Sequence, residues 1–121
     1  MRPLLLLLGA VGLGCSPPPP AAVAVEVACA PEATPLRQRC RVRLTDRHTG
    51  RAVEGATVTL AAEMPSMPLL HRVRPVTAAP GPQPGTYQGT LELEMAGRWV
   101  VAVRISRPLN DQVTHTLDVG S

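Results

Sequence analysis

The chain has very few aromatic residues: one Trp, one Tyr and no Phe among 121 residues. Proteins that bind single-stranded nucleic acid stack the bases on aromatic side chains, so this scarcity argues against a nucleic-acid partner. Lysine is absent, so arginine supplies all 12 basic Lys or Arg side chains, and the net charge is +3. Serine is also scarce, and no serine lies in a nucleophile-elbow motif, which leaves a small hydrolase as the last of three functional hypotheses.

The sequence also lacks an apolar run long enough for a transmembrane helix. The longest run ends before Cys15 after about a dozen residues, whereas a membrane-spanning helix needs roughly 20. Arg2, the leucine block at residues 4–8 and the small residues at 9–14 follow the order of regions in a secretory signal. Residues 1–14 are therefore predicted to be a removable export signal.

Cys15 follows this signal directly. The segment Val11-Gly12-Leu13-Gly14-Cys15 resembles a bacterial lipobox, in which the cysteine is lipidated and becomes the first residue, although Gly12 replaces the usual Leu, Val or Ile. The prolines at 17–20 predict a stiff, extended spacer over residues 15–22. We expect a lipoprotein anchored to a membrane on the periplasmic or cell-surface side. The alternative is ordinary export with cleavage near residues 21–22, which would release a soluble protein.

The other two of the three cysteines, Cys29 and Cys40, form an even pair within the domain. An exported protein resides in an oxidising compartment where disulfides persist, so we expect Cys29 and Cys40 to be bonded. The alternative is a pair of thiolates that hold a metal, although no CxxC spacing supports it.

Beyond the spacer, apolar and polar residues alternate with period two, which is the pattern of half-buried strands. The runs at 23–29 and 40–44 predict a hairpin that brings the two cysteines together. Residues 46–50 predict a tight turn in which Gly50 takes a positive φ. Further strands are expected at 56–62, 69–76, 87–95, 99–105 and 113–119. The sequence thus predicts an all-β, immunoglobulin-like sandwich of about seven strands over residues 23–121, with Trp99 in its core.

Three segments, read in order, resemble a known family. They are residues 46–60 (DRHTGRAVEGATVTL), the Met64-Pro65-Ser66-Met67 element, and residues 85–99, which begin Gly85-Thr86-Tyr87 and end in GRW. Over roughly residues 36–107 the chain is similar to the YtkA-like family, which is related to FixH-type proteins. The first segment alone is unspecific, and the order of all the elements is more specific. The resemblance implies an immunoglobulin-like sandwich and an extracytoplasmic, non-enzymatic module of the kind often found near metal-handling or respiratory proteins.

Met64, Met67 and His71 form the candidate metal site. Thioether sulfur is a soft donor that suits Cu(I), and imidazole binds both oxidation states of copper. On a regular strand the two methionines would face opposite ways, but Pro65 and Pro68 predict an irregular loop. His115 and Met95 are possible additional donors. The alternative is that Met64 and Met67 fill gaps at one end of the sandwich, a role to which flexible methionine is well suited; a third possibility is a loop that contacts a protein.

The arginines at 37, 39, 41 and 43 share one face of a predicted strand. A solvated strand face is the favoured interpretation, with a binding surface as the alternative. Two functional hypotheses therefore lead: a lipid-anchored interaction module that binds an envelope protein by strand addition at a sheet edge, and a copper-binding accessory protein.

Overall fold

The computed structural model describes residues 22–68, 72–107 and 110–120. The predicted signal, Cys15 and most of the predicted spacer lie outside the described residues. Eight strands are present in the described part: β1 (Val23–Glu32), β2 (Thr34–Asp46), β3 (Thr57–Glu63), β4 (Arg72–Thr77), β5 (Ala79–Pro80), β6 (Thr86–Glu92), β7 (Gly97–Arg107) and β8 (Asp111–Val119). This part contains no helix that is long and apolar enough to cross a membrane.

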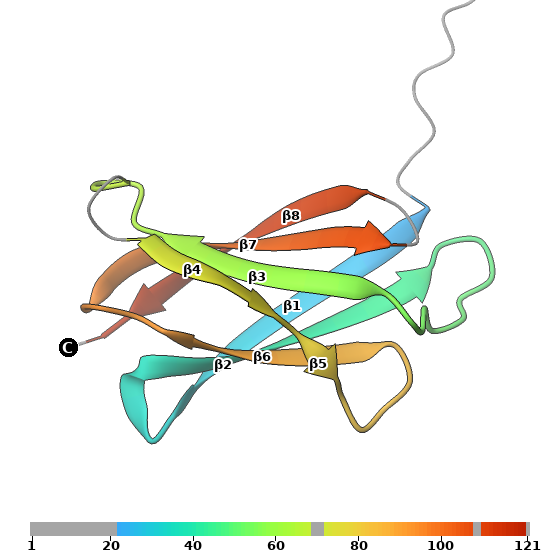
Figure 1. Ribbon diagram of the computed structural model, residues 1–121, viewed down its shortest axis with the longest axis horizontal. Coiled ribbons are helices and arrows are strands. Elements are labelled where there is room, and N and C mark those ends of the chain that lie inside the picture. The colour runs from blue at the N-terminus through green and yellow to red at the C-terminus, as the bar shows by residue number, and fades with distance from the viewer. Residues whose placement is uncertain (1–21, 69–71, 108–109, 121) are drawn as a thin grey trace, which may run out of the picture.

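The strands form two antiparallel four-stranded sheets that pack face to face (Figure 1). One sheet has the order β1-β2-β6-β5 and the other β4-β3-β7-β8. The first is the order of the A-B-E-D sheet of an immunoglobulin fold, and the second is its C-F-G sheet with one further strand beside C. The prediction of an all-β sandwich is confirmed.

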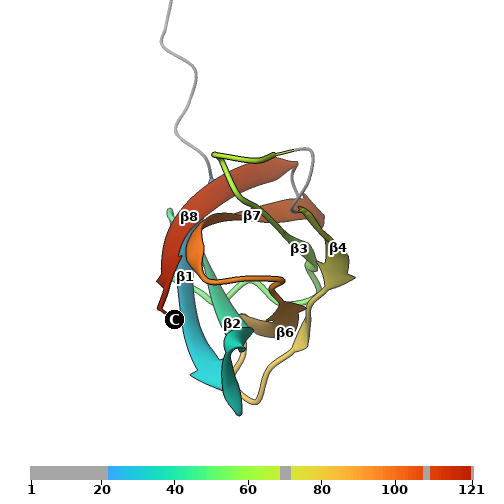
Figure 2. The same cartoon turned by 90° about the vertical axis from the view of Figure 1, so that its left-hand side faces the viewer.

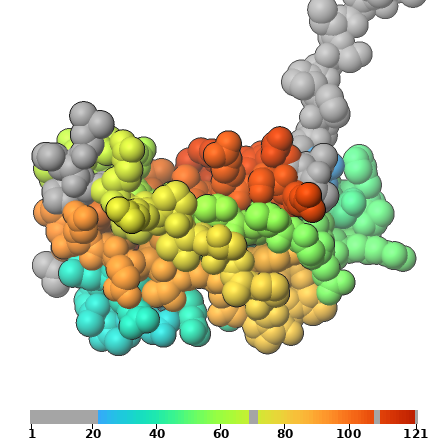
Figure 3. Space-filling view, in the orientation of Figure 1, coloured from blue at the N-terminus to red at the C-terminus, as the bar shows by residue number. Residues whose placement is uncertain are grey.

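The additional strand arises where the chain changes sheets. Between β4 in one sheet and β5 in the other stands the single residue Ala78, which is buried and whose backbone N–H donates to the Val58 carbonyl at 2.9 Å. Figure 3 shows β4 and β5, in yellow, running diagonally across this side of the molecule. A two-residue strand that contains Pro80 gives no alternating pattern, and the sequence therefore predicted seven strands.

The inward-facing residues of both sheets form one aliphatic core. Trp99 is its largest fully buried side chain, as predicted, and its indole N–H donates to the Met95 carbonyl at 3.0 Å. The alternation at 87–95 was extended too far, however. Strand β6 ends at Glu92, Leu93 is still buried, and the chain then turns, which leaves Met95 37% exposed.

The β1–β2 hairpin brings the two cysteines together, as predicted. Cys29 lies directly opposite Cys40, and a disulfide joins them with an S–S distance of 2.06 Å. After β2, Gly50 takes a φ of 72° within the predicted turn. Antibody domains connect their two sheets with a disulfide, whereas this one connects neighbouring strands of a single sheet.

The four edge strands differ from one side of the sandwich to the other (Figure 2). On one side lie β4, which carries Pro75 and a register irregularity opposite β3, and the two-residue β5. On the other side lie β1 and β8, of ten and nine residues, with no proline before Pro31 near the end of β1. Proline and irregular register discourage pairing at an edge, so the β1 and β8 edges are the more open ones.

Removal of the disulfide is expected to destabilise the domain substantially. A Cys29→Ala/Cys40→Ala variant should lose about 3 kcal/mol of unfolding free energy, because the unfolded chain regains the entropy of the closed loop. Urea denaturation of the wild type under oxidising and reducing conditions checks this result. The double variant should match the reduced wild type, and equal stability of all the samples would contradict the expectation.

Candidate functional site

The predicted irregular loop after β3 is present and begins with a tight turn. The Met67 N–H donates to the Met64 carbonyl at 3.0 Å, which places both methionines on one turn. Met64 is only 5% exposed and belongs to the core, while Met67 is half-buried and packs against it. A Cβ atom on Gly97 would come within 2.7 Å of the Met64 Cε, so the Met64 methyl group fills the space that Gly97 leaves. Both thioethers thus pack against this end of the sandwich.

Of the other residues of the candidate copper site, Met95 lies in the turn after β6, where it is 37% exposed. His71 lies in the undescribed segment 69–71, so its position relative to the methionines stays a prediction. His115 is half-buried in the middle of β8, directly opposite Val101 of β7. Within the described ranges, no three His, Cys, Asp or Glu side chains gather into a group that could hold a metal.

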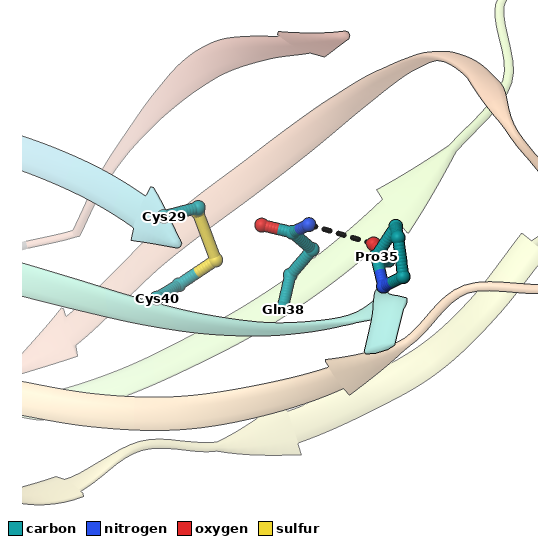
Figure 4. Close-up of a disulfide and its surroundings, with 4 residues drawn as sticks. All are labelled: Cys29, Pro35, Gln38 and Cys40. Carbon is teal, nitrogen blue, oxygen red and sulfur yellow. Dashed lines mark hydrogen bonds between the residues drawn. A yellow bond between two sulfur atoms is a disulfide. The ribbon is translucent and has the colours of Figure 1, made fainter. Parts of the chain in front are cut away.

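Gln38 was not singled out in the sequence, yet it is the buried polar residue beside the disulfide (Figure 4). Its side-chain N–H donates to the Pro35 carbonyl at 2.7 Å, while its Oε1 has no hydrogen-bond partner in the described structure. Gln38 shares the inward parity of Cys40, whereas the arginines on either side of it point outward. The sequence signal for Gln38 is its inward parity, which places an amide where an apolar side chain is the norm.

Tyr87 was expected only to face the core, but its hydroxyl also holds the long connection between β2 and β3. The hydroxyl donates to the Val53 carbonyl at 2.8 Å and accepts from the Ala56 N–H at 3.0 Å. Gly85, two residues earlier, has a φ of 77°, and a Cβ there would lie 2.8 Å from the Ala52 Cβ and 2.9 Å from the Leu44 carbonyl oxygen. The Gly-x-Tyr element therefore fits directly against the 46–56 connection.

The outward face of β2 carries its four arginines as predicted, and all four are exposed. The Arg37 Nε lies 3.1 Å from the Glu92 Oε1, and the Arg39 Nε lies 3.0 Å from the Glu32 Oε2. The second contact is an ion pair without hydrogen-bond geometry. Among the described residues, no ion pair or hydrogen bond engages the side chain of Arg41 or Arg43.

Several of the chain's carboxylates also have structural partners. The Asp46 Oδ1 accepts the backbone N–H groups of His48 at 2.8 Å and Thr49 at 3.1 Å. These bonds, led by that from Thr49, hold the pKa of Asp46 below its usual value, because they favour the charged carboxylate. The Arg98 guanidinium, 2.8 Å from the Asp118 Oδ1, likewise lowers the pKa of Asp118. Asp46 thus caps its own turn and does not orient the His48 side chain.

Comparison with known proteins gives one match. The model of the YtkA-like family matches residues 20–104, which is most of the chain. No curated protein and no solved structure matches. The match includes the 46–56 connection, the Met-Pro-Ser-Met turn, Gly85 and Tyr87, all of which make packing or hydrogen-bonding contacts in the structure.

Loss of the Tyr87 hydroxyl should weaken the connection that it holds. Tyr87→Phe leaves the Val53 carbonyl and the Ala56 N–H without their partner, and we expect a loss of about 2 kcal/mol of unfolding free energy. Chemical denaturation measures this change. Thr114→Val, which removes an exposed hydroxyl from β8, should shift the stability by less than about 0.5 kcal/mol. A similar result for both variants would show that the Tyr87 hydrogen bonds contribute little.

Proposed function

Because this chain belongs to the YtkA-like family, we propose that it is an exported, lipid-anchored, non-enzymatic module that binds a protein partner at the cell envelope. Export is supported by the signal pattern of residues 1–14 and by the Cys29–Cys40 disulfide, since disulfides persist in oxidising compartments. Cys15 stands where a lipidated cysteine is expected, eight residues before the start of β1. The intervening chain can extend to at most about 28 Å, which would keep the domain near the membrane surface.

The observation that carries the binding function is the asymmetry of the sheet edges. Strands β1 and β8 present long edges on one side, whereas proline and short length blunt β4 and β5 on the other. An open edge offers unpaired backbone N–H and C=O groups to an extended segment of a partner, which is the basis of binding by strand addition. The module would therefore contact its partner along β1 or β8.

Photo-crosslinking in cells tests this proposal on the full chain. A photoreactive amino acid replaces Ala28 on β1, Thr114 on β8 or Arg74 on β4, one at a time. Irradiation should produce a discrete protein adduct from the β1 or β8 position, because those edges accept a partner strand, and none from the β4 position. Adducts are resolved by gel electrophoresis of the membrane fraction.

Cys15→Ser is the control for the anchor. It should release the chain from washed membranes and reduce the yield of the adduct, because the domain is then no longer concentrated near its partner. A wild-type chain that stays in the soluble fraction would contradict lipid anchoring. Equal adducts from all three positions would contradict binding at the open edges.

A copper-binding accessory protein is the second candidate. The supporting observation is that one turn presents both Met64 and Met67, each with a thioether suited to Cu(I), directly before the segment that contains His71. These three residues would hold the ion. The burial of Met64 also fits a purely structural role, so the candidate needs a direct test.

Titration of the mature chain with Cu(I) against a competing chelator separates the two roles. Copper binding predicts one tightly held ion per chain, which is lost in Met64→Leu/Met67→Leu. Leucine preserves the apolar volume, so the fold should survive with a stability change below about 1.5 kcal/mol. Failure of the wild type to compete with the chelator would exclude this candidate and leave the interaction module.

A further inference from the structure

The outward face of the β1–β2 hairpin has positive charge that the described structure does not neutralise. Arg37 and Arg39 form ion pairs, but Arg41 and Arg43 do not, although Glu26 lies opposite Arg43 in the neighbouring strand. The two free guanidinium groups are neighbours on one strand face. Residues two apart on a strand are separated by roughly 7 Å, so Arg41 and Arg43 stand about that far apart along β2.

Small residues on β1 leave this charge accessible from the edge of the sheet. Ala28 lies directly opposite Arg41, and Ala30 opposite Arg39. An open depression of about 540 Å³ lies over the two alanines, with Arg39 and Arg41 in its lining. A second depression of about 380 Å³ adjoins it, shares Ala28 and Arg41, and extends to Arg43, Thr86 and the carboxylate of Glu26. No bulky side chain of β1 therefore separates Arg41 from the edge.

A strand that pairs with β1 would lie about 4.8 Å beyond it, and hence about 10 Å from β2. The long side chain of Arg41 can cross Ala28 and reach a carboxylate that projects from the same face of that added strand. Glu26 stands between Arg43 and the edge, so Arg41 is the arginine that reaches the added strand directly, while Arg43 adds positive charge beside it. Arginine binds carboxylates through charge-assisted and often bidentate hydrogen bonds.

We propose that the β1 edge binds an extended acidic segment of a protein partner, in which an Asp or Glu side chain opposite Ala28 pairs with Arg41, and Arg43 adds to the positive charge of the same face. The inference rests on the proposed function and names the chemistry of its partner. Backbone pairing along β1 would supply the binding mode, and the two arginines would select acidic segments over neutral or basic ones.

The test uses the mature chain and a labelled peptide of roughly nine residues, a strand's length, in which glutamate alternates with threonine. A matched peptide carries glutamine in place of glutamate. We expect the acidic peptide to bind, to protect β1 amides from hydrogen exchange, and to bind about tenfold more weakly to Arg41→Gln/Arg43→Gln. Arg104→Gln/Arg107→Gln removes the same charge from exposed positions on β7 and should leave the affinity within about twofold.

Four outcomes would overturn the inference. Equal weakening by both double variants would show a response to net charge alone. Protection of β8 in place of β1 would move the binding to the other open edge. Binding to vesicles that contain phosphatidylglycerol, lost in Arg41→Gln/Arg43→Gln, without binding to the acidic peptide would assign the arginines to a membrane surface. A yield of crosslinked partner that is unchanged in Arg41→Gln/Arg43→Gln would also contradict the inference. It would leave the proposed interaction module intact.

Discussion

The domain depends above all on the packing of two sheets around an aliphatic core in which Trp99 is the largest side chain. Sheets in a sandwich lie about 10 Å apart, and their facing side chains must fill that space. Valine, leucine and alanine supply most of the core, so Trp99 contributes a volume that none of its neighbours provides. Its hydrogen bond to the Met95 carbonyl satisfies the indole N–H, which allows full burial without an unpaired donor.

The sequence predicted those parts of the fold in which burial repeats every second residue. The parity of Cys29, Cys40 and Trp99 placed all three on inward faces, and the pairing of the two cysteine-bearing strands as a hairpin followed from it. Strand β5 escaped detection because Ala79 and Pro80 are too few to alternate. Met95 was assigned to the core because parity does not show where a strand ends and a turn begins.

Contacts between distant segments leave no periodic signal, and for this reason the roles of several site residues could not be predicted. The packing of Met64 over Gly97 and the hydrogen bonds from Tyr87 to Val53 and Ala56 each join positions more than thirty residues apart. In the structure these contacts join two pairs of segments: the Met64 turn with Gly97, and Tyr87 with the connection between β2 and β3. One pair holds the end of the sandwich where β1 begins, and the other holds the opposite end, where β8 finishes (Figure 1). These segments, all within the region that the family model matches, therefore close the two ends of the domain.

The arrangement of open and blunted edges also limits how copies of this domain can assemble. An endless cross-β stack requires each sheet to offer an open edge on both sides, so that every added molecule presents a new edge for the next. Here each sheet has one open edge, β1 or β8, and one blunted edge, β5 or β4. Growth of either sheet would stop after a single addition. The proline residues of β4 and β5 thus stop either sheet from growing into a continuous cross-β stack.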